Sequence, residues 1–308
     1  MSKHHGRVLV AGSINTDLVG RFQRAPEAGE TVTGSTFQVF GGGKGANQAV
    51  SAARSGAEVA MLGAVGNDDF GRQRLDDLMV DGVDVTDVDV TTEAPSGVAL
   101  ITVEEATGQN RIGYIPGATM TLGPASAVDA VERFQPVVVL ATLELPEDAR
   151  DAAFAAARNQ GALVVVNATP EAEGVRGHLP FVDALVVNET EAADLLGYPV
   201  DPENAAEGPR ALGLHGPRIV LITLGAAGAL LLSDGDTLQI PAPEVEVVDT
   251  TGAGDATVGA FGARLAVGDD AVSAARAGVV AGSLACTRPG AQPSMPTAAE
   301  IDAMLARM

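Results

Sequence analysis

The stretch "ALVVVNA" (residues 162–168) is apolar at every position except its asparagine, and three of its residues are valine. Runs of this kind are typical of strands that are buried on both faces of a sheet. Similar runs recur between alanine-rich stretches: "RVLVAG" (7–12), "AEVAMLGAVG" (57–66), "PVVVLA" (136–141), "DALVVN" (183–188) and "RIVLITLG" (218–225). The alternation predicts a three-layer, Rossmann-like α/β fold with a mostly parallel central sheet.

Helices are expected between these strands, at about 45–55, 70–80, 123–134, 147–160, 189–196, 253–267, 270–286 and 297–307. Two segments break the rhythm, because residues 17–40 and 95–117 alternate apolar and polar side chains at period two around glycine-containing turns. This pattern is typical of hairpins with one solvated face. We therefore expect one α/β domain over residues 1–308, with the two insertions forming a small β-sheet lid.

The composition excludes several classes of partner. The chain has 308 residues, with 40 acidic against 19 basic side chains and a net charge of −21. Such a charge repels nucleic acids and anionic membranes, so neither is an expected partner. An acidic chain whose only lysines are Lys3 and Lys44 suggests a halophilic protein kept soluble at high salt.

The cellular location is expected to be the cytoplasm. Cys286 is the single cysteine, which excludes an intramolecular disulfide and fits a reducing compartment. No apolar run approaches membrane-spanning length, and "MSKHHGRVLV" (1–10) lacks the apolar core of a signal peptide.

The glycine-rich stretch "GGGKGANQAV" (41–50) runs into an expected helix and has the composition of a phosphate-binding loop. It fails the P-loop spacing, because Gln38 stands where the first glycine belongs and Gly45 where a hydroxyl should follow. A dinucleotide fingerprint fits poorly, since the preceding strand belongs to the expected lid and Glu58 precedes the next strand. A tight turn without a ligand stays possible. The position of Lys44 in this turn, close to Asn47, nevertheless favours a specific contact.

A second glycine loop, "VVDTTGAGDATVGAFGARL" (247–265), leads into another expected helix. Backbone N–H groups at Gly252, Ala253 and Gly254 can converge on one anion there, with the helix dipole adding to the attraction. Asp255 would stand at the same helix start, where a carboxylate can also serve only to stabilise its own helix. An anion pocket beside a carboxylate is what phosphoryl transfer to a hydroxyl requires.

At this point a resemblance to a known family is visible. The motifs "GSINTD" (12–17), "GGKGANQAV" (42–50), "NETEA" (188–192), "ITLGAAG" (222–228), "DTTGAGD" (249–255) and "TRPGAQPS" (287–294) resemble those of the ribokinase/PfkB family of carbohydrate kinases. The match runs in order over essentially the whole chain. It implies a ribokinase-like fold and an ATP-dependent kinase that phosphorylates the primary (5-) hydroxyl of D-ribose.

The resemblance also implies roles for individual residues. Asp255 would be the general base, with Gly252, Ala253 and Gly254 as the anion hole. The sugar would contact Asp255 together with Asn15, Asp17, Gly43, Lys44, Asn47 and Glu144. These side chains offer the hydrogen-bond donors and acceptors that a polyol needs. Asn15 as a turn residue and Glu144 as a solvated residue before a helix remain simpler explanations.

For the nucleotide, the resemblance implies a site formed by Asn188, Glu191, Thr223, Leu224, Gly225, Gly228 and Gly254. Glu191 would organise Mg²⁺ through water, although Asn188 and Glu191 also fit an ordinary helix opening. A monovalent cation, typically K⁺, is implied at Asp249, Thr251, Ala285, Arg288, Gly290 and Ser294. Oxygen ligands of that kind suit a hard cation.

Some positions depart from the family pattern. Ala226, Ala227 and Val279 stand where more polar residues are expected near the nucleobase, which puts strict ATP preference in doubt. On the lid, Tyr114 could stack on a nucleobase and Arg111 could pair with a sugar phosphate, or both could face solvent.

Other functions therefore stay open beside the ribose kinase. A kinase of the same family could act on a nucleoside, deoxyribose, a 2-keto-3-deoxy sugar acid or a sugar phosphate. A sugar-binding protein without catalysis and a nicotinamide oxidoreductase are the alternatives from other classes. The lid sheets of two subunits are expected to pack together as a homodimer.

Overall fold

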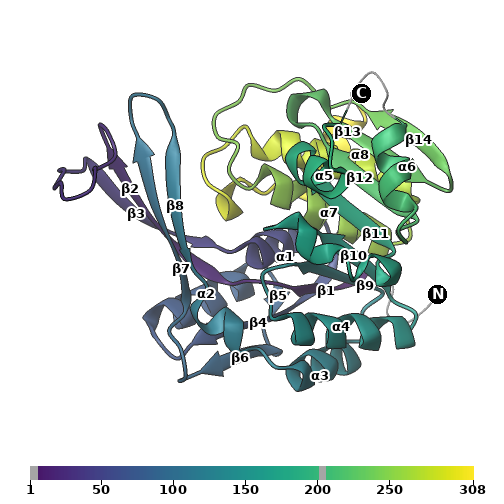
Figure 1. Ribbon diagram of the computed structural model, residues 1–308, viewed down its shortest axis with the longest axis horizontal. Coiled ribbons are helices and arrows are strands. Elements are labelled where there is room, and N and C mark those ends of the chain that lie inside the picture. Colours follow the sequence, from purple (N-terminus) through teal and green to yellow (C-terminus); the bar gives the residue numbers. More distant parts are fainter. Residues whose placement is uncertain (1–5, 201–205) are drawn as a thin grey trace.

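The computed structural model describes residues 6–200 and 206–308. A large sheet lies between two layers of helices, and a second, smaller sheet projects from one side (Figure 1). In spatial order the large sheet contains β14 (Asp236–Ile240), β13 (Ala229–Ser233), β12 (Ile219–Thr223), β11 (Ala184–Asn188), β10 (Leu163–Asn167), β9 (Val138–Thr142), β1 (Arg7–Ala11), β4 (Glu58–Gly66) and β5 (Val83–Asp84). Strand β6 (Val88–Thr91) also pairs with β4.

The strands from β12 to β5 are parallel, and β13 and β14 add an antiparallel edge. All six predicted strands are present, and the predicted α/β fold class is confirmed. The central strands carry apolar side chains on both faces because helices cover both, and Val8, Leu9 and Val10 are fully buried.

The helices separate into two layers, each with its own apolar core. One core packs against α1 (Lys44–Arg54), α2 (Asp69–Val80), α7 (Ala253–Ala266), α8 (Ala271–Ala285) and α9 (Ala298–Leu305). The other packs against α3 (Pro124–Phe134), α4 (Glu147–Asn159), α5 (Glu189–Leu196) and α6 (Glu207–Gly213). Short 3₁₀ turns are η1 (Gly117–Thr121), η2 (Ala172–Val175), η3 (Leu179–Phe181), η5 (Gly225–Ala227) and η6 (Gln292–Ser294). No described helix is both long enough and apolar enough to cross a lipid bilayer.

The short strands β5 and β6, the hairpin of β13 and β14 and helix α6 were not predicted. The hairpin of β13 and β14 turns at Asp234 and Gly235, whose φ angles of 51° and 85° are those of a type I′ turn. An Asp-Gly pair beside an apolar run is a hairpin signal, so this element could have been found from the sequence. Helix α6 has seven residues and no side-chain cap, so the sequence carries little local indication that a helix forms there.

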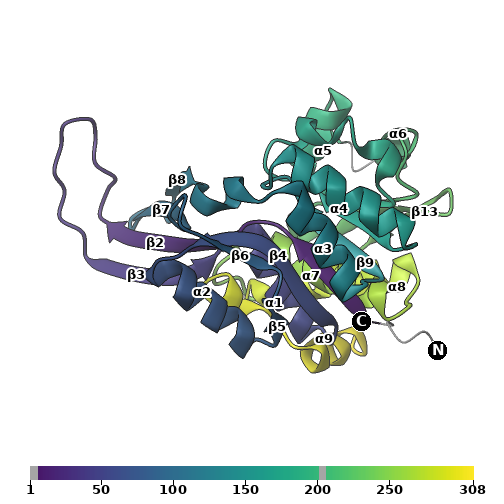
Figure 2. The same cartoon turned by 90° about the horizontal axis from the view of Figure 1, so that it is seen from below.

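The smaller sheet, hereafter the lid, has the order β3 (Thr36–Gly42), β2 (Asn15–Phe22), β7 (Gly97–Glu104) and β8 (Asn110–Ile115). Each predicted insertion forms one antiparallel hairpin, and β2 and β7 join the two hairpins as a parallel pair. Figure 2 shows the lid strands extending away from the helical layers. Because β2 follows β1 closely and β3 leads directly into α1, the lid is anchored where the large sheet ends.

The lid has two different faces. Phe40, Asp17, Ala99 and Tyr114 are direct cross-strand partners and therefore share one face. The opposite face carries Phe37, Val39, Leu18, Leu100 and Ile115. Of these, Phe37, Val39, Leu100 and Ile115 are exposed. The lid thus presents an apolar surface on the side away from Asp17.

Candidate active site

The carboxyl ends of β10, β11 and β12 meet the amino-terminal ends of α1, α5 and α7, as is usual for ligand sites of open α/β sheets. A cavity of about 180 Å³ lies at this junction. It is lined by residues from both predicted half-sites: Lys44, Asn188, Glu191, Thr223, Gly252, Gly254 and Asp255. The fold therefore brings the predicted sugar and nucleotide regions together.

Asp255 lies in the first turn of α7 and is partly buried. Its two carboxylate oxygens accept separate hydrogen bonds, Oδ2 from Asn47 Nδ2 at 2.9 Å and Oδ1 from Gln48 Nε2 at 3.0 Å. Burial raises the pKa of Asp255 to about 6, although these two donors and Lys44 act in the opposite direction. The carboxylate is thus a stronger base than an ordinary aspartate and still ionised at pH 7.

The start of α7 has the geometry of an anion site. Gly252 precedes the helix with φ of 77°, a left-handed conformation that favours glycine. The N–H of Ala253 donates to the Thr250 carbonyl at 3.2 Å and is therefore already engaged. The N–H groups of Gly254 and Asp255 have no acceptor within the helix at these positions, so they can meet an anion.

The glycine loop at the start of α1 packs against the chain after β1. A side chain at Gly43, whose φ is 90°, would come within 2.6 Å of the Ser13 carbonyl oxygen. Only glycine allows the backbone to come this close. The close approach places Lys44 beside Glu144, and Lys44 Nζ lies 3.7 Å from Glu144 Oε1. Ser13 donates its hydroxyl hydrogen to the other oxygen of Glu144. The solvated alternative for Glu144 is therefore wrong, because its side chain is only 3% exposed.

Several polar atoms around this loop are buried and unpaired. Asn15 Oδ1, Asn47 Oδ1 and Thr119 Oγ1 have no hydrogen-bond partner among the described residues. Burial raises the pKa of Asp17 to about 6, with Arg74 and Lys44 acting against the rise. Unpaired buried acceptors cost free energy, so a ligand rich in hydroxyl groups would stabilise this pocket.

On the nucleotide side, Asn188 and Glu191 form a capping box at the start of α5. The Asn188 N–H donates to Glu191 Oε2, and the Glu191 N–H donates to Asn188 Oδ1, both at 2.8 Å. The predicted helix opening is confirmed, and both side chains also line the cavity. Burial raises the pKa of Glu191, while the Asn188 backbone, the Thr169 hydroxyl and Lys44 oppose that rise.

The remaining predicted nucleotide residues follow β12. Thr223 ends this strand, and the Leu224 N–H donates to the Gly228 carbonyl at 2.8 Å. Gly225 and Gly228 have φ angles of 56° and 89°, and a Cβ on Gly228 would lie 2.0 Å from the Ile240 carbonyl oxygen. These glycines therefore form a tight turn beside the cavity.

The predicted cation residues lie on three segments that approach one another. Asp249 Oδ2 accepts from the Gly290 N–H at 2.9 Å, and Oδ1 accepts from the Thr251 N–H and hydroxyl at 2.9 and 2.7 Å. Although partial burial opposes it, these donors lower the pKa of Asp249 below its usual range. Arg288 directs its guanidinium to Glu300, so only its carbonyl is available to a cation. An ionised carboxylate among backbone carbonyls fits a monovalent cation.

The end of α8 and the 3₁₀ turn η6 complete this region. The Ala285 carbonyl accepts from the Arg288 N–H at 3.3 Å, and the buried Ser294 hydroxyl donates to the Ala291 carbonyl at 2.8 Å. Both oxygens keep a free lone pair, so these two positions remain compatible with a cation.

Sequence reasoning missed several side chains of this region: Ser13, Gln48, Thr119, Thr142, Asn167 and Thr169. Asn167 and Thr169 line the cavity, and Thr142 donates to Glu144 Oε2 at 3.3 Å. For all of these except Thr119, the available signal was a place at or just beyond the end of a predicted parallel strand or within a quoted motif.

Tyr114 and Arg111, the two lid residues that depart from the family pattern, lie on opposite faces of the lid. Tyr114 lies on the face of the lid that carries Asp17. Burial raises the pKa of Tyr114 to about 12, with interactions from Asn15, Thr119 and Ser13 partly opposing the rise. Arg111 lies on the other face and pairs with Glu104 at 3.1 Å. Tyr114 therefore lies on the same face of the lid as the predicted sugar residue Asp17, and Arg111 does not.

Two further groups of residues lie outside this junction. His178 lies near Glu147 and Asp151, but its Nδ1 is 2.9 Å from Asp151 and its Nε2 is 3.1 Å from Arg150. Both ring nitrogens are thus engaged, and the adjacent guanidinium disfavours a metal ion.

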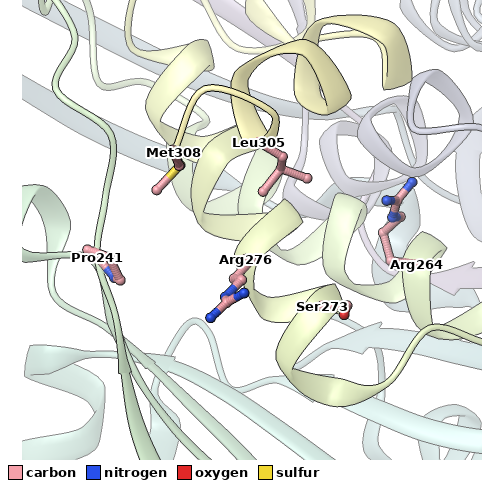
Figure 3. A pocket seen from close by; sticks show the side chains of 6 residues that line it. All are labelled: Pro241, Arg264, Ser273, Arg276, Leu305 and Met308. Atoms are coloured by element: carbon pink, nitrogen blue, oxygen red, sulfur yellow. The ribbon is translucent and has the colours of Figure 1, made fainter.

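A roomier cavity of about 420 Å³ is lined by residues of α7, α8, the chain end and Pro241 (Figure 3). Its Arg264 pairs with Asp269 and Asp302 at 2.8 and 3.3 Å. Arg264 is about 14 Å along α7 from Asp255, at 1.5 Å per residue. This cavity is therefore separate from the junction that holds the predicted catalytic residues.

Comparison with known proteins identifies relatives of the whole chain. The family model described as pfkB family carbohydrate kinase matches residues 6–298. A ribokinase of Bacillus subtilis is 38% identical over 299 residues, covering 97% of this chain and 99% of its own. The ribokinase structure from Thermotoga maritima superposes with a TM-score of 0.87 at 29% identity, covering 98% of this chain and 99% of the other. The Arabidopsis thaliana ribokinase, complexed with ribose and ATP, gives a TM-score of 0.86 at 28% identity with the same coverage.

Proposed function

The chain belongs to the pfkB family of carbohydrate kinases, and we propose that it transfers the γ-phosphate of ATP to the primary 5-hydroxyl of D-ribose. The relatives described above support this choice, since they are ribokinases and one was solved with ribose and ATP. The observation that carries the proposal is the position of Asp255. It is a base with a raised pKa at a helix amino terminus, in a cavity shared by both predicted half-sites.

In the proposed reaction, Asp255 accepts the proton of the 5-hydroxyl as the hydroxyl oxygen attacks the γ-phosphorus. The bond from this phosphorus to the β,γ-bridging oxygen breaks, and ADP leaves. The free N–H groups of Gly254 and Asp255 at the start of α7 stabilise the charge that develops on the transferred group. Lys44 reaches the same cavity and adds a positive charge there. The lid covers the sugar and excludes water, so that ATP is not hydrolysed in its place.

The proposed sugar contacts follow from the unpaired polar atoms. Asn15 Oδ1 and Asn47 Oδ1 accept sugar hydroxyl hydrogens, as do the carboxylates of Asp17 and Glu144. Lys44 donates, and Gly43 lets the backbone approach closely. Such paired donors and acceptors reject an acceptor that lacks the matching hydroxyl more strongly than an apolar pocket would.

For the donor, we propose that ATP lies along Asn188, Glu191, Thr223 to Gly228 and the start of α7. Mg²⁺, held through water by Glu191, would neutralise phosphate charge. K⁺ would bind at Asp249 and the neighbouring carbonyls and so hold the loop before α7 in place. High cytoplasmic K⁺ would keep this site filled in a halophilic cell, which is the habitat that the net charge of −21 suggests.

We further propose a homodimer formed through the apolar face of the lid. Phe37, Val39, Leu100 and Ile115 are 40–67% exposed on one face of a chain that is otherwise strongly acidic. A contiguous exposed apolar surface is typical of an interface. A second copy of the same face would bury these side chains.

A panel of acceptors assayed with ATP and Mg²⁺, with and without K⁺, tests the proposed function. We expect ribose to be turned over fastest, beside a nucleoside, deoxyribose, a 2-keto-3-deoxy sugar acid and ribose 5-phosphate. Undetectable ribose turnover beside strong turnover of another acceptor would reassign the substrate. Absence of turnover with every acceptor, despite ribose binding by calorimetry, would favour a sugar-binding protein without catalysis.

A further inference from the structure

We propose that Gln48 is a positioning residue for Asp255, and that Asn167 anchors the Gln48 amide in the orientation that this role requires. This inference rests on the proposed function, because it assigns Asp255 as the base. It concerns a side chain that cannot itself reach the sugar, since Gln48 is fully buried between α1 and α7.

A chain of hydrogen bonds connects a backbone carbonyl of the sheet to the base. Asn167 Nδ2, at the end of β10, donates to the Val186 carbonyl of β11 at 3.1 Å. Its Oδ1 accepts from Gln48 Nε2 at 2.9 Å, and the same nitrogen donates to Asp255 Oδ1 at 3.0 Å. Both hydrogens of the Gln48 amide are therefore used.

Groups that can only accept hydrogen bonds stand at both ends of this chain and fix its polarity. The Val186 carbonyl can only accept, so it must face the NH₂ group of Asn167. That orientation turns Asn167 Oδ1 towards Gln48. Because Oδ1 is an acceptor, Gln48 must donate to it from its own NH₂ group. Rotating the Gln48 amide would set its oxygen against two other oxygens. The present orientation persists although Gln48 Oε1 is buried without a partner among the described residues.

Close helix packing makes this reach possible. A Cβ on Gly259, one turn beyond Asp255 in α7, would lie 2.5 Å from the Gln48 carbonyl oxygen. Glycine at this position therefore allows α1 and α7 to approach until Gln48 meets Asp255. Ser51 lies one turn further along α1 and donates its hydroxyl hydrogen to the Ala256 carbonyl at 2.9 Å.

The adjacent residues Asn47 and Gln48 thus each hold one carboxylate oxygen of Asp255, but only Asn47 is proposed to bind the substrate. Asn47 holds Asp255 Oδ2 and keeps an unpaired Oδ1 for a substrate hydroxyl. Gln48 holds Oδ1 from a fully buried position and is not itself among the residues that line the cavity. Of the other charged groups that act on Asp255, Lys44 lowers its pKa and Glu144 raises it.

The test is the pH dependence of kcat in the purified full-length protein, with Gln48→Met as the variant. Methionine keeps the length of the side chain and removes the donor. We expect kcat at pH 7 to fall about tenfold, because a hydrogen bond to a charged group is lost. The acidic limb of the profile should move to higher pH by about one unit, and KM for ribose should change less than twofold.

Ser51→Ala is the matched control, because it removes a buried hydrogen bond at the same helix interface without touching Asp255. It should lower Tm and leave the pH profile unshifted. The proposal is overturned if Gln48→Met leaves the acidic limb in place, or if Ser51→Ala moves it equally.

A second variant, Asn167→Ala, decides the matter if Gln48→Met does not fold. It removes the acceptor of the second Gln48 N–H, so the amide is held less firmly against Asp255. The acidic limb should therefore shift in the same direction, and an unchanged limb counts against the proposal. The wild-type protein is assayed first. Failure of the ribose assignment would show as absent wild-type turnover with ribose, and the profiles are then compared with the acceptor that the panel identifies.

Discussion

Replacing Asp255 by asparagine should lower activity and raise stability in the same protein. The substitution removes the charge and keeps the shape. Asn47 can rotate its amide so that its unpaired Oδ1 accepts from the new NH₂ group. Gln48 continues to donate to the remaining oxygen, so the fold should be kept.

The size of the stability change follows from the pKa. Burial raises the pKa of Asp255 from 3.8 to about 6 in the folded chain. A group whose pKa is raised by folding favours the folded state at low pH, and this advantage is lost as the pH rises from about 4 to 6. About two pKa units correspond to about 3 kcal/mol. Weaker hydrogen bonds to a neutral amide reduce the net gain of Asp255→Asn to about 1–2 kcal/mol at pH 7.5.

Thermal unfolding of both proteins at pH 7.5 and pH 4.5 measures the effect. For a chain of this length, 1–2 kcal/mol corresponds to about 2–3 °C in Tm. We expect this increase at pH 7.5 and little difference at pH 4.5, where Asp255 is already protonated. Loss of the base should lower kcat about 10²–10⁴-fold, with ribose binding largely kept in calorimetry. An unchanged kcat, or a Tm that falls at both pH values, would refute the reasoning.

Other perturbations address the remaining parts of the site. Lys44→Met removes the positive charge beside the buried Glu144 carboxylate and should raise KM for ribose about tenfold or more, so an unchanged KM in steady-state kinetics would contradict the proposed contact. Burial raises the pKa of Asp17 to about 6, so KM for ribose should fall as the pH rises through that value, and Asp17→Asn should abolish this trend. Asp249→Ala should remove activation by KCl, measured against choline chloride at equal ionic strength, and persistent activation would argue against the cation site. Leu100→Lys places a charge on the apolar face of the lid and should convert a dimer to a monomer in light scattering, whereas a monomeric wild-type protein would argue against that interface.

Many of the secondary-structure elements and candidate site residues could be predicted from short, local sequence patterns. Continuous β-branched runs such as residues 162–168 must be covered on both faces, so the parallel sheet followed from the pattern alone. The helix start at Asn188 also followed locally, because its cap residues are three positions apart. The motif at 249–255 indicated a base beside an anion site before any tertiary contact was known.

Sequence patterns could not decide which distant side chains meet. Gln48 and Asp255 are 207 positions apart, and Ser13 and Glu144 are 131 apart. Their contacts depend on strand order and helix packing, which no local pattern encodes. The lid shows the same limit, since period-two alternation separates Tyr114 from Arg111 without telling which of the two faces the site. The sequence by itself determined the elements and the reacting groups. Only the tertiary structure decided their neighbours, because hydrogen bonding and burial depend on distances between segments far apart along the chain.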